Sequence, residues 1–214
     1  MKLFKNIKKW LENQEHLFYL FLLILIVPNI ILCFTEPMPV VAKVCNVLLP
    51  FAFYYLLMTL SRNCGKMFWI LFLFIFFGAF QIVLLYLFGQ SIIAVDMFLN
   101  LVTTNSSEAM ELLDNLVPAL VSVIILYIPA LILAAISIIK KRKLSPEFIR
   151  RERKKAWIAL LIGFISLGAA YGLDKRYELQ SDLYPANVCY NVALAFQRNA
   201  QTRTYHRTSE NFTF

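Results

Sequence analysis

Charged side chains are scarce in this chain of 214 residues: Asp, Glu, Lys and Arg make up 16% of it, and hydrophobic residues make up 60%. A soluble domain of this size carries roughly 25% charged residues, because its surface must be polar. The mean hydropathy is +0.66, and the apolar residues come in long blocks. The sequence therefore excludes an ordinary soluble domain and predicts a membrane protein.

Histidine and paired cysteine motifs are also rare. The two histidines, His16 and His206, are far apart, and the four cysteines show no CxxC or Cys/His metal spacing. The residues therefore indicate no complete metal site in this chain. Cys33 and Cys45 lie near one end of the first predicted helical hairpin, which leaves a disulfide between them as one alternative. Buried free thiols are the favoured alternative.

Five apolar segments have the length of membrane spans. Polar or proline-containing turns separate them, and the last span contains three glycines, Gly163, Gly168 and Gly172, that suit close helix packing. The fold class that follows is all-α, a polytopic membrane bundle of five transmembrane helices. The spans lie at about 17–34, 40–60, 67–88, 116–139 and 156–173.

Lys and Arg residues are distributed unevenly between the spans. With the N-terminus inside, the inner segments hold fifteen of the 21 Lys and Arg residues, most of them in a predicted basic loop at 140–155. The positive-inside rule then predicts a cytoplasmic N-terminus and a periplasmic C-terminus in a bacterial inner membrane. This distribution accounts for the net charge of +8. Nucleic-acid binding is disfavoured, because the aromatic residues sit inside the apolar blocks.

Two segments on the outer side are neither spans nor free loops. Residues 89–115 alternate apolar and polar side chains, which predicts two short amphipathic helices on the membrane surface, broken near 104–106. Asn105 and Glu108 have the spacing of a capping box for the second helix. The tail at 174–214 is polar, and Pro185 can open a helix within it. That helix suits the membrane surface or a packed soluble domain equally well.

Asn100, Thr104 and Glu108 are each four residues apart. On one helix they share a face, and around a break near Thr104 they can still converge at the outer rim of the bilayer. A carboxylate at that depth can pair with the ammonium of a lipid headgroup, and amide and hydroxyl groups can bind a phosphate. The alternative is structural: Glu108 is only a capping residue, and Thr104 only marks the helix break.

Two motifs resemble those of a known family, the lipid A phosphoethanolamine transferases. Residues 96–109, which read DMFLNLVTTNSSEA, contain Asn100-x3-Thr104-x3-Glu108-Ala109. The family has an Asn-x3-Thr-x3-Glu-Ala pattern after its third span. Residues 183–188, LYPANV, and 211–214, NFTF, resemble the family's passage from the last span into the catalytic domain. With five spans, the resemblance covers essentially the whole chain.

The resemblance implies a transferase that moves phosphoethanolamine from phosphatidylethanolamine to lipid A, which lowers the binding of cationic peptides such as polymyxin. Family members continue into a periplasmic domain of the alkaline-phosphatase and sulfatase type, with a threonine nucleophile and zinc. We therefore expect no catalytic residue and no bound zinc in this chain. The expected partners are phosphatidylethanolamine, lipid A, other membrane lipids and a catalytic domain in cis, with no nucleic acid. Asn100, Thr104 and Glu108 are the predicted substrate-binding residues.

Two other functions remain open. The chain can be a non-catalytic membrane anchor or assembly protein. A small transporter is less favoured, because transporters carry ionisable residues within their spans. Here Lys43, near the outer end of the second predicted span, is the one Lys, Arg, Asp or Glu within the five.

Overall fold

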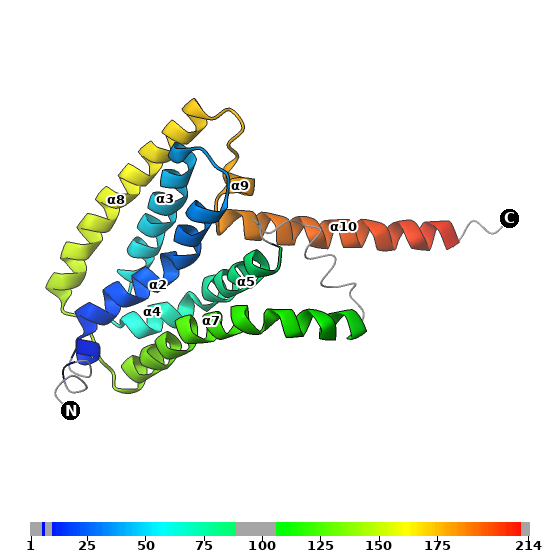
Figure 1. Ribbon diagram of the computed structural model, residues 1–214. Coiled ribbons are helices and arrows are strands. Elements are labelled where there is room, and N and C mark those ends of the chain that lie inside the picture. Colours follow the sequence, from blue (N-terminus) through cyan, green and yellow to red (C-terminus); the bar gives the residue numbers. More distant parts are fainter. Residues whose placement is uncertain (1–5, 7–9, 89–105, 211–214) are drawn as a thin grey trace.

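The computed structural model describes residue 6 and residues 10–88 and 106–210. Every regular element in this part of the chain is an α-helix, so the predicted all-α class is confirmed (Figure 1). The main helices differ in length, from four residues in the shortest to 34 in the longest. The long ones are α2 (Gln14–Thr35), α3 (Val40–Met58), α7 (Ser106–Ile139), α8 (Pro146–Leu173) and α10 (Ala186–Glu210), and the others are α4 (Cys64–Ile70), α5 (Phe72–Phe88) and α9 (Leu179–Asp182).

The apolar helices have the length of membrane spans. Four helical stretches are long and apolar enough to cross a bilayer: α2, α3, residues 117–139 of α7, and α8. Helices α4 and α5 qualify together as a fifth span, although they are bent by 61° at the break between them. The predicted third span therefore forms as two helices, broken at Leu71.

The helices pack side by side into one bundle. The most extensive pairing is that of α3 with α8, followed by α2 with α3 and α4 with α7. At the α4–α7 contact, a Cβ added to Gly65 would lie 2.3 Å from the backbone oxygen of Ala134. At the α3–α8 contact, a Cβ added to Gly163 would lie 3.1 Å from the Cα of Leu49. Only residues without a side chain allow such close approach.

The glycines of the last span divide into two groups. Gly163 packs closely against α3, as predicted, whereas Gly168 and Gly172 have nothing within 4 Å of where a Cβ would stand. The prediction of close packing therefore holds for one of the three. The other two face away from the bundle.

Helices α7 and α8 are longer than the predicted spans. Helix α7 runs unbroken from Ser106 to Ile139, so the second predicted surface helix and the fourth span are one element. The predicted basic loop at 140–155 is helical from Pro146 onward. The side chain of Ser145 caps α8 by accepting a hydrogen bond from the Phe148 N–H at 3.1 Å. Proline at the first helical position needs no N–H partner, so α8 begins after the first four basic residues of this segment and includes the other five.

The bundle has two distinct ends. Helix α2 ends, α3 begins and α8 ends at one of them, which we call the α9 end. The other, where α3 ends and α8 begins, is called the basic end. Helix α10 leaves the bundle from the α9 end (Figure 1). The 34 residues of α7 correspond to about 51 Å, whereas the hydrocarbon layer is about 30 Å thick. Helix α7 therefore extends beyond the length of a span.

Candidate functional site

A buried polar network begins at a proline in α3. Pro50 has no N–H group, so the carbonyl of Asn46, four residues earlier, loses its helical partner. Asn29 of α2 supplies the missing bond, because its Nδ2 donates to this carbonyl at 2.9 Å. The side chain of Asn29 is fully buried. Asn29 therefore joins α2 to α3 one turn before Pro50.

The same two asparagines hold the connector that follows α8. Asn29 Nδ2 also donates to the carbonyl of Tyr184 at 2.8 Å. Asn46 Nδ2 donates to the carbonyl of Asp182 at 2.7 Å, and Asn46 Oδ1 accepts from the hydroxyl of Tyr177 at 2.9 Å. Directional bonds from two spans thus fix a segment that would otherwise be an exposed loop.

The two connector tyrosines are themselves buried. Tyr177 is 3% exposed and Tyr184 is 1% exposed, and the Tyr184 hydroxyl donates to the carbonyl of Phe74 in α5 at 2.9 Å. Burial raises the pKa of Tyr184 well above its usual value. Burial, and next a hydrogen bond to Cys45, raise the pKa of Tyr177 as well. Both hydroxyls therefore stay protonated across the physiological range.

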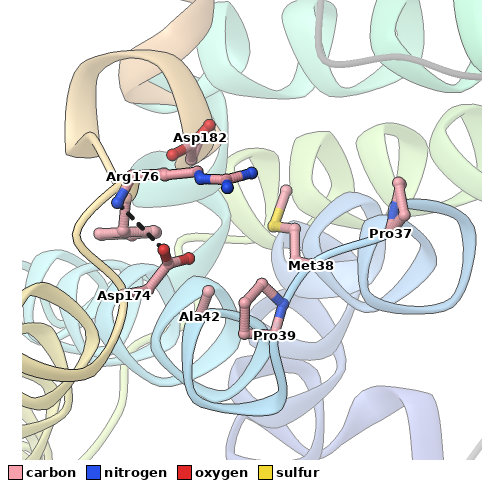
Figure 2. Close-up of a pocket in the computed structure, with 8 residues that line it drawn as sticks. Pro37, Met38, Pro39, Ala42, Asp174, Arg176 and Asp182 are labelled. Atoms are coloured by element: carbon pink, nitrogen blue, oxygen red, sulfur yellow. Dashed lines mark hydrogen bonds between the residues drawn. The ribbon is translucent and has the colours of Figure 1, made fainter.

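A pocket with a cavity volume of 460 Å³ lies beside this connector, at the start of α3. Figure 2 shows Asp174, Arg176 and Asp182 on the connector side, opposite the turn that carries Met38. Asp174 accepts a hydrogen bond from the Arg176 N–H at 3.0 Å. The pocket thus combines one guanidinium and two carboxylates above apolar residues. Its remaining lining residues are Pro37, Pro39, Ala42 and Tyr177.

Two of the three predicted site residues, Asn100 and Thr104, lie outside the described residues. Glu108 is the third residue of α7, and only its backbone is described. It precedes Val117 by nine residues, which is about 13 Å along the helix axis. The predicted convergence of the three side chains, and the predicted cap at Asn105, stay predictions.

Sequence reasoning missed a buried carboxylate at the basic end. Glu152 of α8 is fully buried and accepts a short hydrogen bond from the hydroxyl of Tyr55. Arg151 Nε lies 2.8 Å and Lys155 Nζ 3.0 Å from its Oε1. In the sequence, Glu152 lies within a run of basic residues that predicts a loop. The Glu–Lys pair at i, i+3 is the signal that could have found it.

The cysteines are unpaired, and possible metal ligands stay apart in the described part of the chain. All four cysteines are free thiols, with Cys45 and Cys64 buried. The Cys33 thiol donates to the carbonyl of Lys43 at 3.2 Å. Within the described part of the chain, no three His, Cys, Asp or Glu side chains gather as a metal site. The zinc that the family resemblance implies would be held by the catalytic domain that the resemblance also implies.

The fold and its apolar helices define a class: a multi-pass α-helical membrane protein with a connector fixed at one end of the bundle. Comparisons add no narrower identity. No protein-family model matches the chain. Neither a curated protein nor a solved structure matches it. The resemblance to lipid A phosphoethanolamine transferases therefore depends on the sequence motifs alone.

Proposed function

We propose that residues 1–214 form the membrane part of a transferase that moves phosphoethanolamine from phosphatidylethanolamine to lipid A. The observation that carries this proposal is the motif Asn100-x3-Thr104-x3-Glu108-Ala109. The proposed location is the bacterial inner membrane, with the basic end in the cytoplasm and the α9 end in the periplasm. The concentration of Lys and Arg at the basic end supports this orientation.

In this proposal the chain binds the lipid substrates and leaves group transfer to another domain. Glu108 pairs with the ethanolamine ammonium, while Asn100 and Thr104 bind the phosphate or the neighbouring backbone. The threonine nucleophile belongs to the sulfatase-type domain that the resemblance implies. Its oxygen forms the new bond to phosphorus, the donor lipid leaves as diacylglycerol, and the phosphoethanolamine group then passes to a phosphate of lipid A.

Helix α7 carries Glu108 to the water side of its apolar stretch. About 13 Å of helix separates Glu108 from Val117, the first residue of that stretch. The polar layer on each side of a bilayer is about 5–8 Å thick. An upright α7 would therefore place Glu108 about 5–8 Å beyond this layer. The proposal thus requires a strongly tilted α7, which brings the carboxylate down to the ethanolamine groups.

The fixed connector also supports the proposal. A catalytic domain that follows the last span must keep a constant height above the lipid substrates. The bonds from Asn29 to Tyr184 and from Asn46 to Asp182 hold the chain at that point. A mobile linker would spread the catalytic groups over many positions and lower the effective concentration of substrate.

The decisive experiment is mass spectrometry of lipid A from Gram-negative cells that express the complete gene. Wild type should add phosphoethanolamine, and Glu108→Gln should reduce the addition at least tenfold at equal protein level. Glu111→Gln is the matched control, since it removes a carboxylate from the same helix outside the motif. Full transfer by Glu108→Gln would contradict the assigned role. No transfer by wild type would favour a non-catalytic anchor.

A further inference from the structure

An apolar groove lies in the bundle below the charged pocket. Its cavity volume is 360 Å³, within the range of small-molecule sites. Helices α3 and α8 form two of its walls, and the segment from α9 to the start of α10 closes it. The residues that define it are Leu49, Pro50 and Phe53 of α3, Leu160 and Phe164 of α8, and Leu183.

The groove and the charged pocket lie one above the other. Ala42 lines the pocket and Leu49 lines the groove, and seven residues of α3 separate them by about 10 Å. Asp174, the residue that follows the end of α8, and Phe164 of α8 are about 15 Å apart by the same measure. Helix α9 borders both, because Leu179 faces the groove and its last residue, Asp182, faces the pocket.

A charged pocket above an apolar groove matches a membrane lipid, which has a polar headgroup above its acyl chains. The groove is bounded by two helices that are apolar enough to span a bilayer, so it faces the hydrocarbon layer. The charged pocket lies where those two helices begin and end, at the level of the headgroups. Two aromatic side chains that line the groove, Phe53 and Phe164, are 41% and 56% exposed. Lipid chains therefore have direct access from the side.

We infer that this site binds one phospholipid, with an acyl chain in the groove and the headgroup in the pocket. Arg176 supplies the guanidinium for the phosphate (Figure 2). Asp174 and Asp182 line the same pocket, which favours a headgroup that also carries a cation. The occupant is thus a zwitterionic phospholipid. The lining residues of the pocket and the groove do not include Asn100, Thr104 or Glu108, so the inference does not depend on the proposed function.

Photo-crosslinking in vesicles tests the groove. The full chain is reconstituted in phosphatidylcholine that contains a trace of phosphatidylcholine with a photoactivatable acyl chain. After irradiation, trypsin releases residues 177–198, and mass spectrometry measures the lipid attached to this peptide. Wild type should label strongly. Leu160→Trp fills the groove and should lower the labelling at least fivefold.

Leu161→Trp is the matched control, because the adjacent side chain is 63% exposed and points away from the groove. Its labelling should equal that of wild type. Ala186→Leu fills the groove from the α10 side. It replaces Leu160→Trp in the assay if circular dichroism and gel filtration show that Leu160→Trp does not fold. Equal labelling of wild type and the folded groove-filling variant would overturn the inference. Absence of labelling on this peptide in wild type would also overturn it.

Headgroup recognition is tested in the same assay. Arg176→Gln removes one cleavage site, so trypsin releases residues 176–198 from this variant, and the labelling of that peptide by phosphatidylcholine should be at least threefold lower than in wild type. Lys175→Gln should leave it unchanged, since Lys175 is exposed and does not line the pocket. Stronger labelling by a phosphatidylglycerol probe than by the phosphatidylcholine probe would overturn the assignment of a zwitterionic headgroup.

Discussion

The α9 end and the basic end of the bundle both contain buried polar groups, but of different kinds. At the α9 end, the amides of Asn29 and Asn46 donate hydrogen bonds to backbone carbonyls. At the basic end, Tyr55 and two cations surround the buried carboxylate of Glu152. The basic end also contains the close contact of Gly65 in α4 with the backbone of α7.

The two kinds of polar group suit two different roles, placement of the connector at the α9 end and contact with the membrane surface at the basic end. An amide carries no charge, and its bonds are directional, so it can hold a loop in one geometry at any ordinary pH or salt concentration. The cations at the basic end are exposed, with side-chain exposures of 59% for Arg151 and 54% for Lys155. Their attraction to Glu152 is screened by salt. The basic end therefore suits contact with water and lipid charges, and the α9 end suits exact placement of a connector.

The largest expected effect is that of Gly65→Ala at the basic end. The added Cβ would lie 2.3 Å from the backbone oxygen of Ala134, so α4 and α7 must separate. Overpacking against backbone should lower the free energy of unfolding by about 3 kcal/mol. Thermal unfolding in detergent micelles, followed by circular dichroism, measures the change. Gly172→Ala is the control, because an added Cβ has open space around it, and it should be neutral or slightly stabilising. An equal decrease in the free energy of unfolding in both variants would refute the role of the close contact.

Asn29→Leu should have the next largest effect, at the α9 end. It leaves the carbonyls of Asn46 and Tyr184 buried without their donor, and each costs about 1–2 kcal/mol. Protease cleavage between residues 174 and 186 should also become faster. Thr35→Val is the control, because it removes only an exposed bond within α2. Unchanged cleavage in Asn29→Leu would show that other contacts hold the connector.

Hydropathy predicted the spans well and their ends less well. The second span, predicted at 40–60, is helical over Val40–Met58. The continuation of α7 and α8 into polar sequence was not predicted, because a hydropathy window ends where charge begins and a helix ends where a cap or turn stops it. The bend at Leu71 contains no proline or glycine, so tertiary packing must set it.

The polar network was partly visible in the sequence. A single asparagine inside an apolar run does not change the assignment of a span. The sequence therefore did not indicate that Asn29 and Asn46 form a polar network. The position of Pro50, four residues after Asn46, already implied a free carbonyl in α3. Its partner could not be predicted, because Asn29 meets it only through the packing of α2 on α3. The motif residues Asn100 and Thr104 lie outside the described residues.

Alkaline pH should destabilise the α9 end through Tyr177. Its pKa is raised above the ordinary value of 10.0, so the unfolded chain releases the proton first as the pH rises. The protonated Tyr177 hydroxyl contributes fully to the free energy of unfolding below pH 10.0. Above this pH the contribution decreases by up to about 1.4 kcal/mol per pH unit. Unfolding between pH 8 and pH 11 should show a shallower loss in Tyr177→Phe than in wild type. Tyr190→Phe, at an exposed position of α10, should follow wild type; a slope unaffected by Tyr177→Phe would exclude this tyrosine as the source.

The smallest expected effect is that of Arg153→Ala. Arg153 donates to the carbonyl of Thr59 at 2.6 Å, where α3 ends. The last carbonyls of a helix lack partners within it, and a cation there also interacts favourably with the helix dipole. The side chain is exposed, so its loss should lower the free energy of unfolding by only about 0.5–1 kcal/mol at low salt.

Salt distinguishes this contact from the amide network. Because ions screen an exposed cation, the effect of Arg153→Ala should shrink in 0.5 M NaCl, whereas that of Asn29→Leu should not. Arg150→Ala is the matched control, since Arg150 is exposed on the same helix and makes no such bond among the described residues. Chemical unfolding at low and high salt measures all three variants. A loss in Arg153→Ala that is independent of salt would mean that the two ends are held by the same kind of force, and the contrast between them would disappear.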